Sequence, residues 1–327
     1  TARFKRVFAY FCRVAKVGPG SGGGQPTGFQ IETGSSAARR VEKGTPMSFF
    51  RCPLCGAPLA EERKTLRCLN GHAFDRAKEG YVNLLPANQK HSKAPGDDKG
   101  MVSARRAFLE KGWYLPLREA LCRLAAAETG SAPDVLDVGC GEGYYTAGVR
   151  DALLSEGKQP VVAGIDISKF SLQKAAKKYP EIEFAVASAY RLPAADASVD
   201  LLLNVFSPLA LEEFRRVLKP GGLYLYVVPA AYHLWELKAV LYDSPYPNEE
   251  KETPYEGFAY QEICPVSYGI RLPAQADIHA LFQMTPYYWK TGKEGAARLA
   301  QLERLDCRVD FRIHVFRRED GACSAYS

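Results

Sequence analysis

The sequence predicts a mixed α/β fold: a Rossmann-like, mostly parallel sheet with an antiparallel closing strand, preceded by a small N-terminal domain built around a metal. Three observations predict it. Short apolar runs alternate with helical patterns from residue 131 to residue 318, which is the rhythm of βαβ units. A glycine-rich turn follows the first of these runs. Three cysteines and a histidine stand at metal-ligand spacing between residues 52 and 72.

Length and charge fit a chain with one large and one small domain. The 327 residues carry 43 Lys and Arg against 37 Asp and Glu, a net charge of +6. Residues 1–46 hold eight of the basic and two of the acidic residues, so the remaining 35 and 35 cancel. Residues 51–119 are locally basic, with 13 Lys and Arg against eight Asp and Glu. A nucleic-acid contact is therefore possible in that segment.

Cysteine usage and hydropathy bear on the compartment. The nine cysteines in so long a chain do not resemble a secreted disulfide framework. No apolar run reaches 18 residues, so we expect no transmembrane helix and no membrane partner. These features favour a reducing, cytoplasmic location.

Residues 1–46 are predicted to be a disordered upstream extension. They contain a glycine-rich linker at residues 18–24, and Met47 opens directly onto the first ligand-like cysteine. We therefore expect Met47 to be the natural start. A basic transit peptide is the alternative, because Arg3, Lys5 and Arg6 are spaced among aromatic residues.

Residues 47–86 are predicted to form a zinc-binding module of the ribbon or knuckle type. Cys52, Cys55, Cys68 and His72 offer three thiolates and an imidazole, the four ligands of a tetrahedral structural Zn²⁺. Four protein ligands leave no open coordination position, so the metal is expected to be structural. Free thiols and a redox-active Cys-x-x-Cys pair are the alternatives.

Residues 87–130 are predicted to be a basic linker followed by a helix. The Lys-rich stretch 89–100 could touch phosphates or could be a solvated loop. Residues 101–124 have a helical pattern. From residue 131 to residue 318 the chain is predicted to be one sheet domain, with a tail at 319–327.

The glycine-rich turn begins the large domain. Residues 134–138 form a short apolar strand that ends in Gly139, Gly141 and Gly143. Glycines allow the backbone to approach a ligand closely, and open α/β sheets bind ligands at the carboxyl ends of their strands. Asp166 ends the next strand, where a carboxylate suits the two hydroxyls of a ribose.

The remaining elements continue the alternation. After a helix at residues 144–154, strands are predicted at 160–166, 182–188, 200–206 and 223–229, with helices at 168–179 and 211–218. Residues 230–275 are expected to form an inserted helix and a lid, and the aromatics of residues 283–289 a nucleobase platform or part of the core. Residues 305–318 alternate apolar and polar side chains and form the antiparallel closing strand.

The large domain resembles the class I S-adenosylmethionine-dependent methyltransferases. The resemblance is carried by residues 137–143, by Asp166 and by the Lys-Pro-Gly-Gly turn at residues 219–222. It implies that the glycine turn cradles the methionine part of the cofactor and that Asp166 binds the ribose. In such enzymes the end of the third strand, here around Ser188, holds the adenine.

A narrower resemblance covers nearly all of residues 47–327. The chain is similar to the bacterial 23S ribosomal RNA guanine-N1 methyltransferases in eight strings that occur in the same order: residues 52–55, 77–86, 95–97, 104–109, 137–145, 191–193, 233–238 and 283–286. It implies methylation of a guanine in a hairpin of 23S rRNA domain II, and it allows a homodimer. The implied zinc ligands are Cys52, Cys55, Cys68 and His72. The cofactor contacts implied by the two resemblances are Tyr114, Asp137, Gly139, Gly141, Glu142, Gly143, Asp166, Ser188 and His233.

The acceptor chemistry is only partly indicated by the residues. Residues 204–208, Asn-Val-Phe-Ser-Pro, lack the Asn/Asp-Pro-Pro-aromatic pattern of amino-group methyltransferases, so exocyclic nitrogens are less favoured acceptors. The sequence identifies no catalytic base. A small-molecule methyltransferase on the same sheet remains the alternative, and a non-catalytic RNA-binding module is a third reading.

Overall fold

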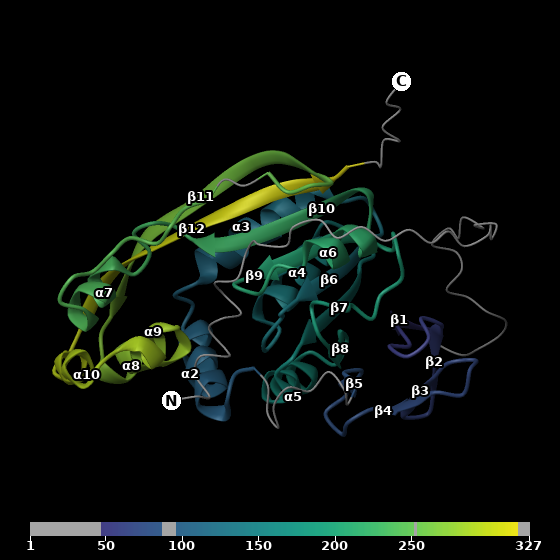
Figure 1. Ribbon diagram of the computed structural model, residues 1–327, viewed down its shortest axis with the longest axis horizontal. Helices are drawn as coiled ribbons and strands as arrows, with labels where there is room; N and C mark the ends of the chain where they lie inside the picture. Colours follow the sequence, from purple (N-terminus) through teal and green to yellow (C-terminus); the bar gives the residue numbers. More distant parts are fainter. Residues whose placement is uncertain (1–46, 87–95, 252–253, 320–327) are drawn as a thin grey trace, which may run out of the picture.

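The computed structural model describes residues 47–86, 96–251 and 254–319, arranged as two sheets of unequal size (Figure 1). The expected extension 1–46, most of the Lys-rich stretch and most of the tail lie outside the described residues. The small sheet has the order β1-β2-β3-β4 and the large sheet has the order β11-β12-β10-β9-β6-β7-β8-β5. The predicted fold class is confirmed.

The small sheet is an antiparallel ribbon. It consists of β1 (Met47–Arg51), β2 (Pro58–Glu62), β3 (Thr65–Arg67) and β4 (Ala73–Asp75). Phe50, Leu59 and Leu66 are fully buried and share one apolar cluster with strands of the large sheet. The ribbon is therefore packed against the large sheet by its own core residues.

The large sheet is parallel through its centre. Its parallel strands are β6 (Asp134–Val138), β7 (Val161–Asp166), β8 (Glu183–Val186), β9 (Val199–Val205) and β10 (Leu218–Pro229), with the short β5 (Val82–Asn83) at one edge. The strands β6 to β9 are almost entirely buried, as expected for strands covered on both faces. The carboxyl ends of β6, β7, β8 and β9 meet at one edge of the sheet.

Two apolar clusters pack on the large sheet. One apolar cluster joins the sheet to α2 (Lys99–Glu110), α3 (Leu115–Glu128), α4 (Tyr144–Ser155) and α5 (Lys169–Lys178). The other joins it to the ribbon and to α6 (Leu211–Val217). Ser168 caps α5 by accepting from the N–H of Ser171, as its sequence position suggested. Within the described residues no helix has the length and apolar character to cross a membrane.

The single helix expected over residues 101–124 is wrong. The structure has α2 and α3 instead, because Gly112 takes a left-handed conformation (φ +79°) and breaks the helical path. The break places Tyr114 at the start of α3, packed edge-on against Phe108 at 4.9 Å between ring centroids.

The lid expected over residues 230–275 is also wrong in part. The segment contains α7 (Trp235–Leu241), but its second half is β11 (Phe258–Leu272), a strand paired along its whole length with β12 (Leu305–Arg318). This strand was not predicted because its apolar and polar side chains are mixed and because it contains Pro265. A proline is tolerated in a strand at the edge of a sheet. Three further helices, α8 (Gln275–Met284), α9 (Tyr287–Lys290) and α10 (Lys293–Ala300), connect β11 to β12.

The join between the ribbon and the large sheet is centred on Glu183 of β8. Its carboxylate accepts from the Ser48 hydroxyl at 2.6 Å and from the Phe49 N–H at 2.8 Å, and Arg76 lies 3.6 Å away. The N–H of Arg51 also donates to the carbonyl of Pro193 at 2.8 Å. Residues 47–86 were expected to form one module, but β5 at its end pairs with β8 in the large sheet.

Candidate active site and metal centre

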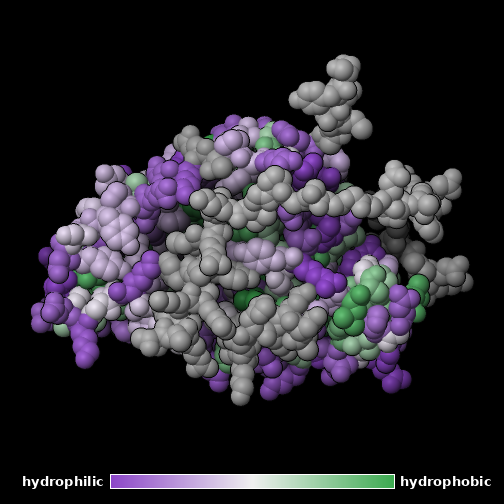
Figure 2. Space-filling view, viewed as in Figure 1, coloured by the Kyte–Doolittle hydropathy of each residue, from purple (hydrophilic) through white to green (hydrophobic). Residues whose placement is uncertain are grey.

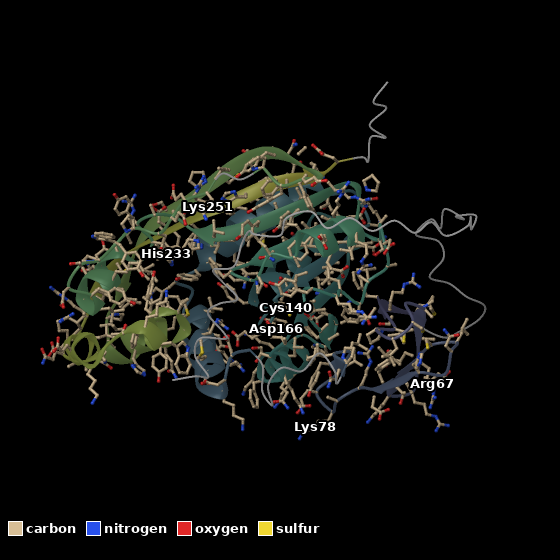
Figure 3. All side chains as sticks on the ribbon, in the orientation of Figure 1. Arg67, Lys78, Cys140, Asp166, His233 and Lys251 are labelled. Atoms are coloured by element: carbon tan, nitrogen blue, oxygen red, sulfur yellow. The ribbon has the colours of Figure 1, made fainter. Side chains whose placement is uncertain are left out.

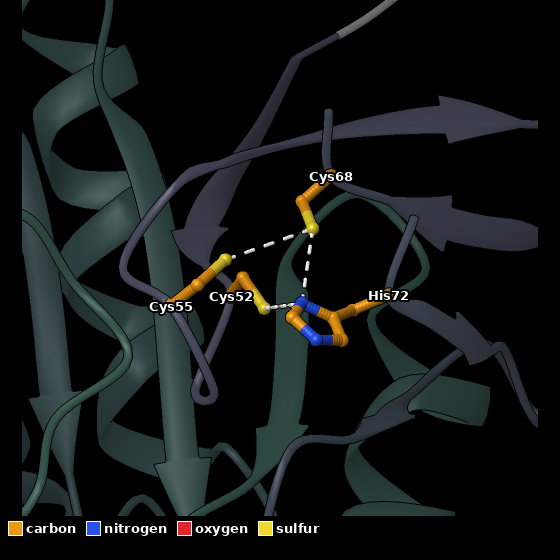
Figure 4. Close-up of side chains that lie close together, drawn as sticks. All are labelled: Cys52, Cys55, Cys68 and His72. Carbon is orange, nitrogen blue, oxygen red and sulfur yellow. Dashed lines mark hydrogen bonds between the residues drawn. The ribbon is translucent and has the colours of Figure 1, made fainter. Parts of the chain in front are cut away.

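The four predicted metal ligands converge in the ribbon. Nδ1 of His72 lies 3.5 Å from Sγ of Cys52 and 3.4 Å from Sγ of Cys68, and Sγ of Cys55 lies 3.8 Å from Sγ of Cys68 (Figure 4). All four ligand atoms lie within 4.8 Å of one another. With Zn–S of about 2.3 Å and Zn–N of about 2.0 Å, tetrahedral ligand atoms stand about 3.5–3.8 Å apart. Three of the ligand-atom distances thus match a tetrahedral Zn²⁺ site, and all four ligand atoms are close enough to share one ion.

Two turns bring the ligands together. Gly56 and Gly71 take left-handed conformations (φ +74° and +81°) just after Cys55 and just before His72. Leu54 and Leu69, which stand beside ligand residues, are exposed to 54% and 96%, and apolar surface is visible over the small domain in Figure 2. The ribbon thus has four potential metal ligands at its centre and apolar side chains on its outer loops.

The glycine turn after β6 has the conformation that the sequence suggested. Gly139, Gly141 and Gly143 have φ of +83°, +56° and +81°, values that only glycine adopts readily. The N–H groups of Gly139 and Cys140 both donate to the carbonyl of Ile165, at 2.8 and 2.9 Å. The turn is therefore tied to the end of β7, and Cys140 and Asp166 lie close together in Figure 3.

Asp137 lies beneath this turn and is 1% exposed. Its Oδ2 accepts from the Thr146 hydroxyl at 2.6 Å, whereas its buried Oδ1 has no hydrogen-bond partner among the described residues. Burial raises the pKa of Asp137 to about 7, and the nearby Asp166 adds to the shift. An unsatisfied buried carboxylate oxygen is costly alone, so this site is suited to a cationic or hydrogen-donating ligand.

Asp166 ends β7 and faces the same turn. Its Oδ2 accepts from the N–H of Gly141 at 2.9 Å and its Oδ1 from the N–H of Ser168 at 2.7 Å. Burial raises the pKa of Asp166 to about 6, and burial likewise raises the pKa of Glu142, within the turn, to about 6. Three acidic side chains thus gather at this edge of the sheet, and a positively charged ligand would stabilise their ionised forms.

Arg105 lies beside this cluster. Its guanidinium pairs with Asp97, and it lies within electrostatic reach of Asp166 and Glu142. The carbonyl of Asp97 accepts from the Ser168 hydroxyl at 2.9 Å, which ties the start of α2 to the end of β7. Sequence reasoning quoted the strings that contain Asp97 and Arg105 but gave neither residue a place at the site.

Ser188 follows β8 at the same edge of the sheet. Its hydroxyl accepts from the N–H of Tyr190 at 3.2 Å, and its backbone forms an isolated bridge with Arg191. The N–H of Ala187 donates to the carbonyl of Asp166 at 3.2 Å. Ser188 therefore lies next to the end of β7, as the sequence placed it.

Tyr114 and His233 meet on the other side of the site, around Phe311 of β12. Their ring centroids are 6.4 Å apart, and Phe311 lies 5.0 Å from Tyr114 and 4.6 Å from His233. Tyr145 connects the two halves, since it lies within electrostatic reach of both Tyr114 and Asp137. The neighbouring Tyr144 is engaged elsewhere, because the Arg118 guanidinium lies 4.9 Å over its ring.

The protonation state of His233 follows from its contacts. The N–H of Asp310 donates to Nδ1 of His233 at 3.2 Å, so the ring proton of the neutral imidazole is on Nε2. Burial lowers the pKa of His233 to about 3, with the positive charge of Lys238 contributing. His233 therefore presents a neutral N–H donor and does not accept a proton near neutral pH.

Residues that sequence reasoning missed are mostly those that hold others in place. Thr146, Ser207, Phe311 and Tyr268 contact site residues or their loops, the last by donating to the carbonyl of Trp113 at 2.8 Å. Tyr268 and Phe311 could not be found from motifs, because they contact site residues that are distant in sequence. Thr146 and Ser207 stand in or beside strings that the sequence analysis quoted, but their contacts appear only in the structure.

Comparison with protein families matches both parts of the chain. Residues 50–93 match the family model described as RlmA, N-terminal, a zinc ribbon, and residues 135–222 match the model described as methyltransferase domain. Sheet, glycine turn and metal centre together define a class I S-adenosylmethionine-dependent methyltransferase with an N-terminal Cys₃His zinc ribbon.

Three relatives narrow this class. A putative 23S rRNA (guanine-N1)-methyltransferase, YxjB of Bacillus subtilis, is 34% identical over 288 residues, covering 84% of this chain and 99% of the relative. A putative 23S rRNA (guanine-N1)-methyltransferase of Micromonospora griseorubida is 42% identical over 209 residues, covering 58% of this chain and 68% of the relative. The 23S rRNA (guanine(748)-N1)-methyltransferase of Streptomyces fradiae is 43% identical over 192 residues, covering 58% of this chain and 66% of that relative's length. The chain belongs to the RlmA-like family of 23S rRNA guanine-N1 methyltransferases, so the family resemblance is confirmed.

Proposed function

We propose that the protein transfers a methyl group from S-adenosylmethionine to N1 of a guanine in the domain II hairpin of 23S rRNA. One observation carries the proposal: the family match spans both the zinc ribbon and the methyltransferase sheet, and in the structure these two parts are joined through Glu183. If the methyl acceptor were a small metabolite, the zinc ribbon would have no evident role in binding it.

The cofactor site that we propose comprises Tyr114, Asp137, Gly139, Gly141, Glu142, Gly143, Asp166, Ser188 and His233. The residues present fit the cofactor, because the unsatisfied Oδ1 of Asp137 can accept from an ammonium group. Asp166 retains lone pairs for ribose hydroxyls beside its two backbone contacts. S-adenosylmethionine, when bound, supplies a methyl group made electrophilic by a sulfonium. The acidic surroundings of Asp137, Glu142 and Asp166 favour that positive charge.

The chain must also present the acceptor nitrogen. Guanine N1 lies on the Watson–Crick edge, so the target has to be unpaired or flipped out of a helix. A bound S-adenosylmethionine would supply the methyl group and depart as the neutral thioether, and the proton on guanine N1 would have to pass to a base or to water. His233 is not the group that takes it, because its Nδ1 is occupied by the N–H of Asp310 and burial opposes its protonation. What His233 can do is donate from Nε2 to an oxygen acceptor.

The division of the chain remains part of the proposal. We assign residues 47–86 to the zinc module, 87–130 to the linker and helix, and 131–318 to the methyltransferase domain, with β5 connecting module and domain. The ribbon would grip the hairpin by shape and phosphate contacts. Because ribosomal RNA is cytoplasmic, we place the reaction there. We also propose that the protein forms a homodimer. Light scattering of the purified protein tests this oligomeric state.

Primer extension tests the function directly. N1 methylation blocks base pairing, so 23S rRNA treated with protein and S-adenosylmethionine should give a new reverse-transcriptase stop in the domain II hairpin. The position named for the Streptomyces fradiae relative, guanine 748, is the first to examine. Reactions without cofactor should lack the stop. No stop from a protein that contains zinc and binds cofactor would contradict the proposed substrate.

A further inference from the structure

Phe206 has a strained backbone at the edge of the sheet where ligands bind. It directly follows β9 and has φ of +54°, in the left-handed region. For a bulky side chain this conformation is a genuine outlier, and such strain persists only where surrounding contacts fix it.

The contacts that fix this turn come from the glycine turn and from β10. A β-carbon on Gly139 would lie 2.1 Å from Oγ of Ser207, so Ser207 packs directly on the glycine turn. The N–H of Phe206 donates to the carbonyl of Val227 at 3.3 Å, and the Asn204 side-chain amide donates to the carbonyl of Pro208 at 2.9 Å. The left-handed conformation of Phe206 thus directs the chain, immediately after β9, so that Ser207 packs against the glycine turn.

The position of this turn in the sheet distinguishes it from the proposed cofactor residues. The proposed cofactor residues that belong to the sheet stand at or just after the carboxyl ends of β6, β7 and β8. Strands β7 and β8 lie on one side of β6. Phe206 comes from β9, the neighbour of β6 on the other side. The chain order reverses between these strands, and open α/β sheets bind ligands in the crevice at such a point. Phe206 therefore stands on the β9 side of β6, opposite the residues that follow β7 and β8.

The ring of Phe206 belongs to an aromatic wall. It lies 5.3 Å from Phe311, which also contacts Tyr114 and His233. Phe206 itself is only half-buried, whereas Tyr114, His233 and Phe311 are buried. Phe206 is thus partly accessible to solvent, and the buried ring of Phe311 supports it.

We propose that Phe206 is the platform on which the target guanine stacks while its N1 faces the methyl donor; this rests on the proposed function. An unpaired base loses its neighbours in the RNA stack, and an aromatic face replaces them. The strained turn holds the ring in one place relative to the glycine turn, which is what positioning for transfer requires. Phe206 would act on RNA binding and alignment and not on the cofactor.

The test compares Phe206→Leu, Phe206→Tyr and Phe206→Gly with the wild type. Leucine keeps the volume but loses the aromatic face, so kcat/KM for a domain II hairpin RNA should fall about tenfold to a hundredfold. Tyrosine keeps the face and should stay within about threefold of the wild type. In all variants the Kd for S-adenosylmethionine, measured by calorimetry, should be unchanged within about twofold.

The glycine variant separates stacking from folding. Glycine adopts φ of +54° without strain, so Phe206→Gly should fold and bind cofactor while losing as much kcat/KM for RNA as the leucine variant. Ala197→Gly is the matched control. Ala197 also has positive φ (+46°) but precedes β9, at the opposite edge of the sheet, so its replacement should leave both measurements unchanged.

The outcomes are distinct. An active wild type with an equally active Phe206→Leu overturns the platform and leaves the proposed function intact. A leucine variant that loses cofactor affinity as much as RNA turnover also overturns it, because Phe206 would then belong to the cofactor site. A wild type that binds cofactor but leaves the RNA unmethylated overturns the proposed function and the platform together.

Discussion

Ser207 occupies the space in which a side chain on Gly139 would have to lie. A β-carbon there would stand 2.1 Å from the Ser207 Oγ and 2.5 Å from its Cβ, at a backbone φ of +83°. We therefore expect Gly139→Ala to weaken S-adenosylmethionine binding at least tenfold, as measured by calorimetry, because the turn must move.

Gly157→Ala is the matched control for that change. Gly157 also has positive φ (+72°), but a β-carbon there would meet no atom within 4 Å. It should lower the free energy of unfolding by about 1–2 kcal/mol through strain alone and leave cofactor affinity unchanged. Equal cofactor affinities for the two variants would contradict the role given to the Ser207 contact.

The cofactor site should bind more tightly as pH rises. Burial raises the pKa of Asp137 to about 7 and those of Asp166 and Glu142 to about 6. A cationic ligand favours the ionised carboxylates, so affinity for S-adenosylmethionine should increase between pH 5.5 and pH 8, with protons released on binding. Calorimetry in buffers of different ionisation enthalpy measures both quantities.

The same carboxylates affect the stability of the cofactor-free protein in the opposite sense. From about pH 4 to pH 7 the folded chain holds these protons more tightly than the unfolded chain, so their contribution to the free energy of unfolding falls as pH rises.

S-adenosylhomocysteine, which lacks the sulfonium charge, is the control ligand for the pH dependence of cofactor affinity. If the affinities for S-adenosylmethionine and S-adenosylhomocysteine changed with pH in the same way, the carboxylates would not be the site that binds the positive charge.

His233 should remain neutral, with its proton on Nε2, throughout the pH range of activity. Burial lowers its pKa to about 3, and the N–H of Asp310 holds Nδ1 at 3.2 Å. Nitrogen-15 NMR of the imidazole should show one tautomer and no titration from pH 5 to pH 8. If His233 titrated near the ordinary histidine pKa in the folded protein, it would become a candidate for the catalytic base.

Removing the metal should affect RNA methylation more than cofactor binding. Cys52→Ser deletes a ligand atom 3.5 Å from Nδ1 of His72, so bound zinc should fall well below one equivalent. Methyl transfer to the hairpin should fall with it, and the Kd for S-adenosylmethionine should change little. Cys122→Ser, a half-buried cysteine of α3, should retain full zinc. Unchanged zinc in Cys52→Ser would contradict the metal centre.

Glu183→Gln should loosen the ribbon from the sheet. The carboxylate accepts from Ser48 and Phe49 and faces Arg76, so the free energy of unfolding should fall by about 2 kcal/mol in denaturant titration. Glu181→Gln is the control, since Glu181 makes one partly exposed ion pair with Arg150 at 3.5 Å. Equal stabilities of the two variants would argue against Glu183 as the centre of the join.

Local patterns predicted the parts of this molecule that local chemistry decides. Cys52, Cys55, Cys68 and His72 carry their ligand chemistry in their spacing, and Gly139, Gly141 and Gly143 stand where the backbone needs glycine. β12 was predicted with its observed bounds because its side chains alternate.

What the sequence could not give depends on distant partners. β11 is a strand because β12 pairs with it, and Glu183 matters because Ser48 and Phe49 lie beside it in space, more than a hundred positions earlier. The neutrality of His233 likewise depends on the Asp310 N–H, which only the path of β12 brings to it.

The two borders of the large sheet differ in how they avoid joining other molecules. On one side β5 covers β8, with Val82 beside Ala185. On the other side the edge strand β11 contains Pro265, which has no N–H to offer to a further strand. A truncated protein without the ribbon segment would uncover the β8 border, where no proline stands. We expect such a fragment to self-associate more readily than the full chain, because a free strand edge pairs with other strands.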